Sequence, residues 1–166
     1  MLILGIDPGT TAIGYGLIEN ETGRTSRQSI VDFGCLKTSP KDSTALRLDD
    51  LHKQLTSLIK KYRPDAIAVE ELFFFTNLKT AIKVSQARGV ILLAAQQNKL
   101  IIYEYTPLQV KQAITGYGLA QKKQIQQMVK AILGLDEIPK PDDAADALAI
   151  AICCANSCKF ETKIAG

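Results

Sequence analysis

The sequence predicts an α/β fold in which a mixed five-stranded sheet is flanked by helices. Three apolar runs of strand length open the chain and are joined by short turns. Helical and strand-like periods then alternate, an order that favours parallel strands joined by right-handed crossovers. The apolar fraction of 46% and the charged fraction of 22% are those of an ordinary globular domain. We therefore expect one domain over residues 1–158 of the 166, followed by a tail over 159–166.

The first three strands are expected to form an antiparallel meander. Residues 1–7 and 12–18 are apolar runs separated by a Pro-Gly pair, and residues 20–24 supply turn chemistry before a third run over 29–36. Strands joined by such short turns pair antiparallel. The first run is apolar almost throughout, which is typical of a strand buried on both faces.

From residue 43 onward, hydrophobic residues recur alternately with helical and strand-like periods. The predicted elements are a helix over 43–62, a strand over 66–71, a helix over 78–97, a strand over 100–105, a short helix ending near 116, a helix over 120–133 and a last helix from 142. The helix over 120–133 is expected to turn four residues inward: Ile125, Met128, Val129 and Ile132. Gly89 costs its helix about 1 kcal/mol relative to Ala, which close packing against another backbone, such as a second subunit, would offset.

Carboxylates stand where buried elements begin or end. Asp7 ends the first strand, Glu70 ends the fourth, and Asp143 and Asp146 share one face of the last helix. Taken singly, each has a structural explanation, because Asp7 can start a turn and the two helix aspartates can cap the helix N-terminus. If the first and fourth strands are parallel neighbours, their carboxylates reach the same sheet edge. The last helix could then close over them.

Four carboxylates in one concavity predict a metal site, because they cannot all stay ionised without cations. His52 is the only histidine, and the four cysteines are spaced for neither a disulfide framework nor a zinc site. Carboxylate oxygens suit Mg²⁺, with Mn²⁺ as a substitute. Two such ions per site would align a water with a phosphodiester and stabilise the leaving oxygen. The pattern therefore favours metal-dependent phosphodiester hydrolysis over a His-based triad.

A basic stretch predicts a polyanionic partner. Residues 79–130 contain eight Lys or Arg residues against one acid, Glu104, so the stretch carries a net charge of +7 and the remainder −4. Such lysines would contact phosphates and position a nucleic-acid strand without reading its sequence. The alternative is that they form solvated helix faces.

Three aromatic residues follow the fourth strand. Phe73, Phe74 and Phe75 cannot all face the core from a loop, so at least one is expected to be exposed beside the acids. There it could stack on an unpaired base or wedge into a helix junction. Core packing is the alternative, and we favour it for Phe75.

The ordered motifs resemble those of the RuvC family of Holliday-junction resolvases across nearly the whole chain. The matching segments are residues 5–10, 68–70, 86–90, 110–112 and 143–151. The resemblance implies a ribonuclease-H-like fold and a homodimer that pairs through the helix containing Gly89. It also implies metal-dependent nicking of two symmetrically placed strands of four-way junction DNA, in partnership with the RuvA and RuvB branch-migration proteins.

The resemblance assigns roles by position. It gives the metal-binding, catalytic roles to four residues: Asp7, Glu70, Asp143 and Asp146. Phe73 matches the family's base-stacking aromatic, while Lys111 and Lys122 match basic residues near the scissile phosphate. Phe74 and Lys123 are neighbours that could share these DNA contacts.

Two other functions are open at this point. The run from Gly5 to Thr11 also resembles the phosphate loop of actin-like and sugar-kinase-like ATP-dependent phosphotransferases, which need two lobes where this length provides one. A module that binds junctions without cutting them is the second. No apolar stretch reaches 18 residues and the N-terminus lacks signal-peptide features, so we expect a cytoplasmic protein without a membrane span.

Overall fold

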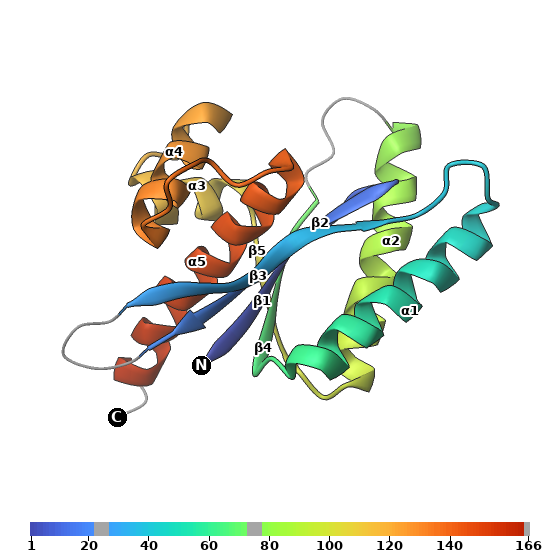
Figure 1. Ribbon diagram of the computed structural model, residues 1–166, viewed down its shortest axis with the longest axis horizontal. Coiled ribbons are helices and arrows are strands. Elements are labelled where there is room, and N and C mark those ends of the chain that lie inside the picture. Colours follow the sequence, from blue (N-terminus) through green and yellow to red (C-terminus); the bar gives the residue numbers. More distant parts are fainter. Residues whose placement is uncertain (22–26, 73–77, 165–166) are drawn as a thin grey trace.

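A computed structural model describes residues 1–21, 27–72 and 78–164 (Figure 1). Within these residues a five-stranded sheet lies between two layers of helices. The strands are β1 (Leu2–Asp7), β2 (Ala12–Asn20), β3 (Gln28–Lys37), β4 (Ala66–Glu70) and β5 (Ile101–Tyr105). The helices are α1 (Thr44–Tyr62), α2 (Leu78–Gln97), α3 (Pro107–Thr115), α4 (Lys122–Leu133) and α5 (Asp142–Ile164).

The sheet combines an antiparallel and a parallel half, in the order β3-β2-β1-β4-β5. β1 pairs antiparallel with β2, and β2 pairs antiparallel with β3. β4 is parallel to both of its neighbours, β1 and β5. The predicted meander and mixed five-stranded sheet are confirmed. The carboxyl ends of the three parallel strands meet at one edge of the sheet.

Helices cover the sheet on both faces (Figure 1). On one face, α1 and α2 pack large aliphatic side chains such as Leu55 and Ile91 against Leu4 and Ile6 of β1. On the other face, α5 lies along β1 and β2, with α3 and α4 beside it. Successive residues of β1 and β4 belong alternately to the cores on the two faces, as expected of strands that are buried on both sides.

The contact between α5 and the sheet is made backbone to backbone. It depends on three glycines that we call the glycine contact: Gly5, Gly14 and Gly16. A Cβ atom at Gly5 would lie 2.2 Å from the carbonyl oxygen of Ala147, and one at Gly14 would lie 2.0 Å from that of Asp143. Any side chain at these positions would therefore push α5 away from the strands.

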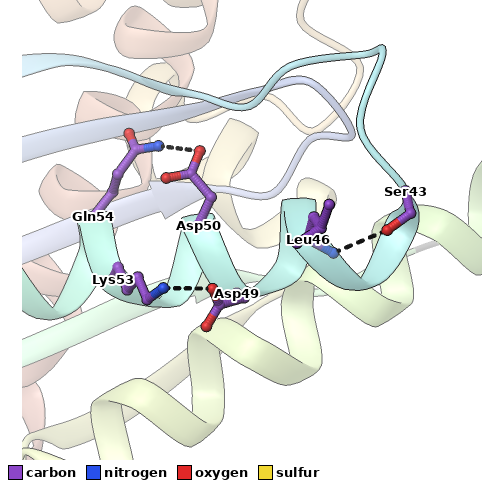
Figure 2. Close-up of polar contacts among 6 residues, drawn as sticks. All are labelled: Ser43, Leu46, Asp49, Asp50, Lys53 and Gln54. Carbon is purple, nitrogen blue, oxygen red and sulfur yellow. Dashed lines mark hydrogen bonds and ion pairs between the residues drawn. The ribbon is translucent and has the colours of Figure 1, made fainter.

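Local signals in the sequence define where the helices begin and end. Ser43 caps α1 by accepting a hydrogen bond from the Leu46 N–H at 3.4 Å, and the adjacent turns carry the pair Lys53–Asp49 (Figure 2). At its other end α1 stops at Arg63, which takes the left-handed conformation. α3 opens with a capping box made by Thr106 and Gln109, and Pro107 occupies its first turn.

The predicted inward face of α4 is wrong at two of its four positions. Ile125 and Val129 are buried, but Met128 and Ile132 are 39% and 36% exposed. Because α4 packs mainly against α3 and α5, the contact covers a narrower stripe than the apolar residues of the helix provide. Gln126 is buried in their place.

Two further expectations concern the C-terminal boundary of the domain and membrane spans. α5 continues to Ile164, past the predicted boundary at residue 158, and the division into a domain and a tail stays a prediction. In the part of the chain that the structure describes, no helix is both long enough and apolar enough to cross a membrane.

Candidate active site

Asp7 and Glu70 reach the same side of the sheet because of strand alternation. Ala68 belongs to the core on the α5 face and Val69 to the core on the α1 and α2 face. The next residue, Glu70, therefore points to the α5 face, whereas Glu71 does not. Asp7 follows Gly5 by two residues and faces α5 as well. The two carboxylates stand at the carboxyl ends of adjacent parallel strands, as the sequence predicts.

The first turns of α5 bring the remaining two carboxylates to this edge. Oxygen atoms of Asp7, Asp143 and Asp146 all lie within 4.8 Å of one another. Gly14 is paired with Asp7 across the sheet, and it is the residue on which the Asp143 backbone rests. The depth at which α5 packs therefore sets the separation of the aspartates.

A cleft of about 230 Å³ opens beside the aspartates. Its polar lining consists of Asp7, Glu70, Asp146, Lys111 and Lys122. The Lys122 ammonium donates to Asp146 at 2.8 Å and lies 3.6 Å from Asp142. Glu70 is outside the 4.8 Å triad but lines the same cleft as two of its members, Asp7 and Asp146.

Burial and mutual repulsion raise the pKa values of the three carboxylates that line the cleft. Desolvation, followed by the charges of Glu70, Asp146 and Asp143, raises the pKa of Asp7 to about 8. Desolvation and the charge of Asp146 raise the pKa of Glu70 to about 7. Burial also raises the pKa of Asp146, although the ammonium of Lys122 opposes this shift.

The crowding of the carboxylate oxygens suits the site to bind a cation. Hard oxygen ligands crowded at one point, and neutralised by one neighbouring ammonium, suit a divalent cation such as Mg²⁺ or Mn²⁺. The three ligand atoms that lie within 4.8 Å of one another are all carboxylate oxygens, whereas Cys153 and Cys154 lie in the core, where Cys153 donates to the Gln109 carbonyl.

The predicted DNA-binding residues are divided by the structure. Lys111 and Lys122 line the carboxylate cleft. Lys123 lines a separate hollow of about 490 Å³ together with Tyr117 and Met128. Phe73 and Phe74 lie outside the described residues, as does Phe75.

The basic stretch does not form one continuous surface. Lys79, Lys83 and Arg88 belong to α2, on the opposite face of the sheet from α3 and α4. Arg88 pairs with Glu104, the single acid of the stretch, and its Nε donates to the backbone oxygen of Glu70 at 3.2 Å. This contact with a predicted catalytic residue was not foreseen, although Arg88 belongs to the segment 86–90 that carries the resemblance.

Comparisons with known proteins agree on one family. The model of the family described as crossover junction endodeoxyribonuclease RuvC matches residues 3–154. The RuvC endonuclease of Halothermothrix orenii is 55% identical over 163 residues, covering 98% of this chain and 97% of its own. That of Desulfitobacterium hafniense is 57% identical over 166 residues, covering 100% and 99%.

Solved structures give the same result. Thermus thermophilus RuvC has a TM-score of 0.90 at 39% identity, covering 98% of both chains. T. thermophilus RuvC in complex with a Holliday junction substrate has a TM-score of 0.86 at 36% identity, covering 96% of both. The yeast mitochondrial Holliday junction resolvase Ydc2 shares the fold, with a TM-score of 0.64 at 17% identity and coverage of 95% of this chain and 85% of its own.

Proposed function

The chain belongs to the RuvC family of crossover junction endodeoxyribonucleases, and from this premise we propose how its carboxylate cleft cuts DNA. The protein is a metal-dependent endonuclease that resolves four-way junctions, and its fold is the ribonuclease-H-like α/β fold expected from the sequence. One observation carries the proposed site: carboxylates from β1, β4 and α5 meet in a cleft that also contains two lysines.

We assign the metal-binding, catalytic roles to four carboxylates: Asp7, Glu70, Asp143 and Asp146. Asp7 belongs to the aspartate triad, lines the cleft together with Glu70 and feels the charges of all three other carboxylates, so it is suited to contact two cations. When bound, two divalent cations would orient the attacking water and stabilise the leaving oxygen of a phosphodiester. We propose Mg²⁺ as the working cation, with Mn²⁺ able to replace it.

Lys111 and Lys122 hold the DNA backbone at the cleft in this proposal. Both side chains line it, and an ammonium group attracts phosphate oxygens without distinguishing bases. Lys122 donates to Asp146 in the structure, so a cation at the aspartates would take over the neutralisation of Asp146 and free Lys122 for a phosphate. Lys123 is proposed to contact the DNA farther from the cut, and Phe73 and Phe74 to stack on unpaired bases.

The exposed face of α2 is the proposed dimer contact. Ile82, Gly89 and Leu93 lie on one side of this helix at spacings of seven and four residues, and both large side chains are exposed. A Cβ at Gly89 would meet nothing within 4 Å in this chain, so the close packing expected at this glycine would come from a second subunit. A dimer presents two clefts, which matches the two strands cut at a junction.

Further proposals follow from the family. We propose that the enzyme works in the cytoplasm with RuvA and RuvB, which would deliver the junction after branch migration. The phosphotransferase alternative is not favoured, because the relatives that match nearly the whole chain are nucleases.

A synthetic four-way junction tests the site assignment directly. We expect Asp7→Asn and Glu70→Gln to reduce nicking about 10²–10³-fold or more, which is the usual cost of removing a group that stabilises transition-state charge. Junction binding, measured by gel shift, should persist in both variants. Asp49→Asn provides the matched control, because it neutralises an exposed α1 carboxylate that pairs with Lys53 (Figure 2).

The assay also separates the alternatives. Unchanged nicking in either cleft variant would overturn the assignment of that residue. Binding of the junction by the native protein without Mg²⁺- or Mn²⁺-dependent nicking would support the non-catalytic binding module instead.

A further inference from the structure

Arg88 connects α2 to the main chain of a proposed catalytic residue. Its Nε donates to the backbone oxygen of Glu70 at 3.2 Å, and its terminal Nη2 pairs with the carboxylate of Glu104 on β5. The Arg88 side chain is 20% exposed, so most of it is covered. The N–H donors of a guanidinium lie in one fixed plane, so Nε and Nη2 can hold two acceptors at a defined separation.

The Glu70 carbonyl needs this donor because of where β1 ends. The Glu71 N–H donates to the Tyr105 oxygen of β5, and successive residues of a strand direct their backbone groups to opposite neighbours, so the Glu70 oxygen faces β1. Ile6 is opposite Val69 in the parallel register, so the next pair along the strands is Asp7 and Glu70. In a parallel pair a carbonyl accepts from the residue after the one opposite it, and for Glu70 that residue is Pro8.

Proline has no N–H to donate. The ladder that holds the rest of β4 to β1 therefore cannot continue at the residue that carries the catalytic carboxylate. A carbonyl left without a partner in this partly buried place would be costly, and it would allow the end of β4 to move. Arg88 supplies the missing bond from the α2 face, while the Glu70 side chain points to the α5 face.

We propose that Arg88 is a positioning residue for Glu70, which fixes the main chain at the end of β4 so that the carboxylate meets those of Asp7 and Asp146. This inference rests on the proposed function and adds to it a residue outside the cleft. Arg88 does not touch the cleft in the structure, because its contacts lie on the other face of the sheet. It acts only through the main chain of Glu70.

Two substitutions of Arg88, compared with one of Glu104, test the proposal. Arg88→Gln removes the charge and shortens the donor arm, whereas Arg88→Lys keeps a charge that can reach one acceptor. We expect Arg88→Gln to lower kcat for junction nicking at saturating metal and DNA by about 10–100-fold, as loss of an outer-shell partner typically does. Arg88→Lys should recover part of this loss, and the Kd for the junction should stay within about threefold of the native value.

Glu104→Gln separates the two contacts of the guanidinium. It weakens an ion pair whose carboxylate is 41% exposed but leaves the Nε bond to Glu70 intact, so kcat should stay within about twofold of native, because partly exposed ion pairs contribute little. An equal loss of kcat in Glu104→Gln and Arg88→Gln would show that the ion pair alone matters, and it would overturn the proposal.

Metal binding gives a readout that does not depend on cleavage. We expect Mn²⁺ titrated into the dimeric protein to bind about tenfold more weakly to Arg88→Gln than to native protein. If the native protein binds Mn²⁺ but does not nick junctions, the proposed function fails while the positioning role is still measured. Native Mn²⁺ affinity and native kcat in both folded Arg88 variants would overturn it, and a far-UV melt establishes that each is folded.

Discussion

The two faces of the sheet meet their helices in different ways. On the α1 and α2 face, the helices meet the strands through aliphatic side chains, among them Leu51, Leu55 and Ile91. On the α5 face, the glycine contact lets a helix backbone touch the strands directly. Interdigitated side chains can adjust by changing rotamers, whereas backbone contacts cannot. The carboxylates are carried by the face whose geometry has the least freedom.

Gly14→Ala against Leu55→Ala is the strongest test of this difference. A Cβ at Gly14 would lie 2.0 Å from the backbone carbonyl oxygen of Asp143, so the start of α5 must move by more than an ångström. We expect nicking to fall about 10²-fold, since misplacement by about 1 Å can have that effect, and Mn²⁺ binding to weaken with it. Leu55→Ala should lower the free energy of unfolding by about 2–5 kcal/mol, with kcat unchanged at temperatures where the protein is folded.

Chemical denaturation and junction nicking, measured on both variants, decide between the faces. A loss of kcat in Leu55→Ala equal to that in Gly14→Ala, in protein shown to be folded, would mean that both faces control the site equally. Full activity in Gly14→Ala would show that α5 can shift without separating Asp7 from Asp143.

Much of this arrangement could be predicted from the sequence. The apolar runs predicted the strands and a mixed sheet, and the carboxylates of Asp7 and Glu70 at their ends could be expected to meet if β1 and β4 were parallel neighbours, which they are. The periods of hydrophobic residues carry that information because burial selects them locally.

Other features depend on tertiary contacts that no local pattern encodes. The exposure of Met128 and Ile132 depends on how wide a stripe of α4 is covered, which its own period does not specify. Gly14 and Gly16 add nothing to the pattern of hydrophobic residues, so that pattern does not specify how closely α5 packs against the strands. Arg88 counted as one of eight basic residues, and only the fold shows that it turns toward the Glu70 carbonyl.

The pH dependence of metal binding tests the α5 face of the sheet alone. The three carboxylates with raised pKa values lie on that face: Asp7, Glu70 and Asp146. Protons compete with cations for these oxygens, and the pKa values are about 8 for Asp7 and about 7 for Glu70. We expect apparent Mn²⁺ affinity to rise about tenfold per pH unit for each proton released between about pH 6 and 8, then to level off.

The stability of the metal-free protein should change in the opposite direction. A carboxyl with a raised folded-state pKa holds its proton where the unfolded chain has lost it, so the free energy of unfolding falls as pH rises from about 4 to about 8. Thermal melts without metal measure this slope, and Asp7→Asn should reduce it by removing the group with the higher pKa. A slope unaffected by Asp7→Asn would place the titrating groups elsewhere.

The smallest expected effect concerns Gly89, a glycine with the opposite environment to Gly14. A Cβ at Gly89 meets nothing within 4 Å in the chain, so Gly89→Ala should raise the free energy of unfolding of the monomer by up to about 1 kcal/mol through the helix propensity of α2. If a second subunit packs here, the same methyl group should weaken the dimer by about 1–3 kcal/mol through overpacking.

Sedimentation at several concentrations measures the dimer, and melts at high dilution measure the monomer. Ser57→Ala, at an exposed position of α1, controls for helix propensity and should leave dimerisation unchanged. A Gly89→Ala protein that dimerises as tightly as native would place the subunit contact away from Gly89.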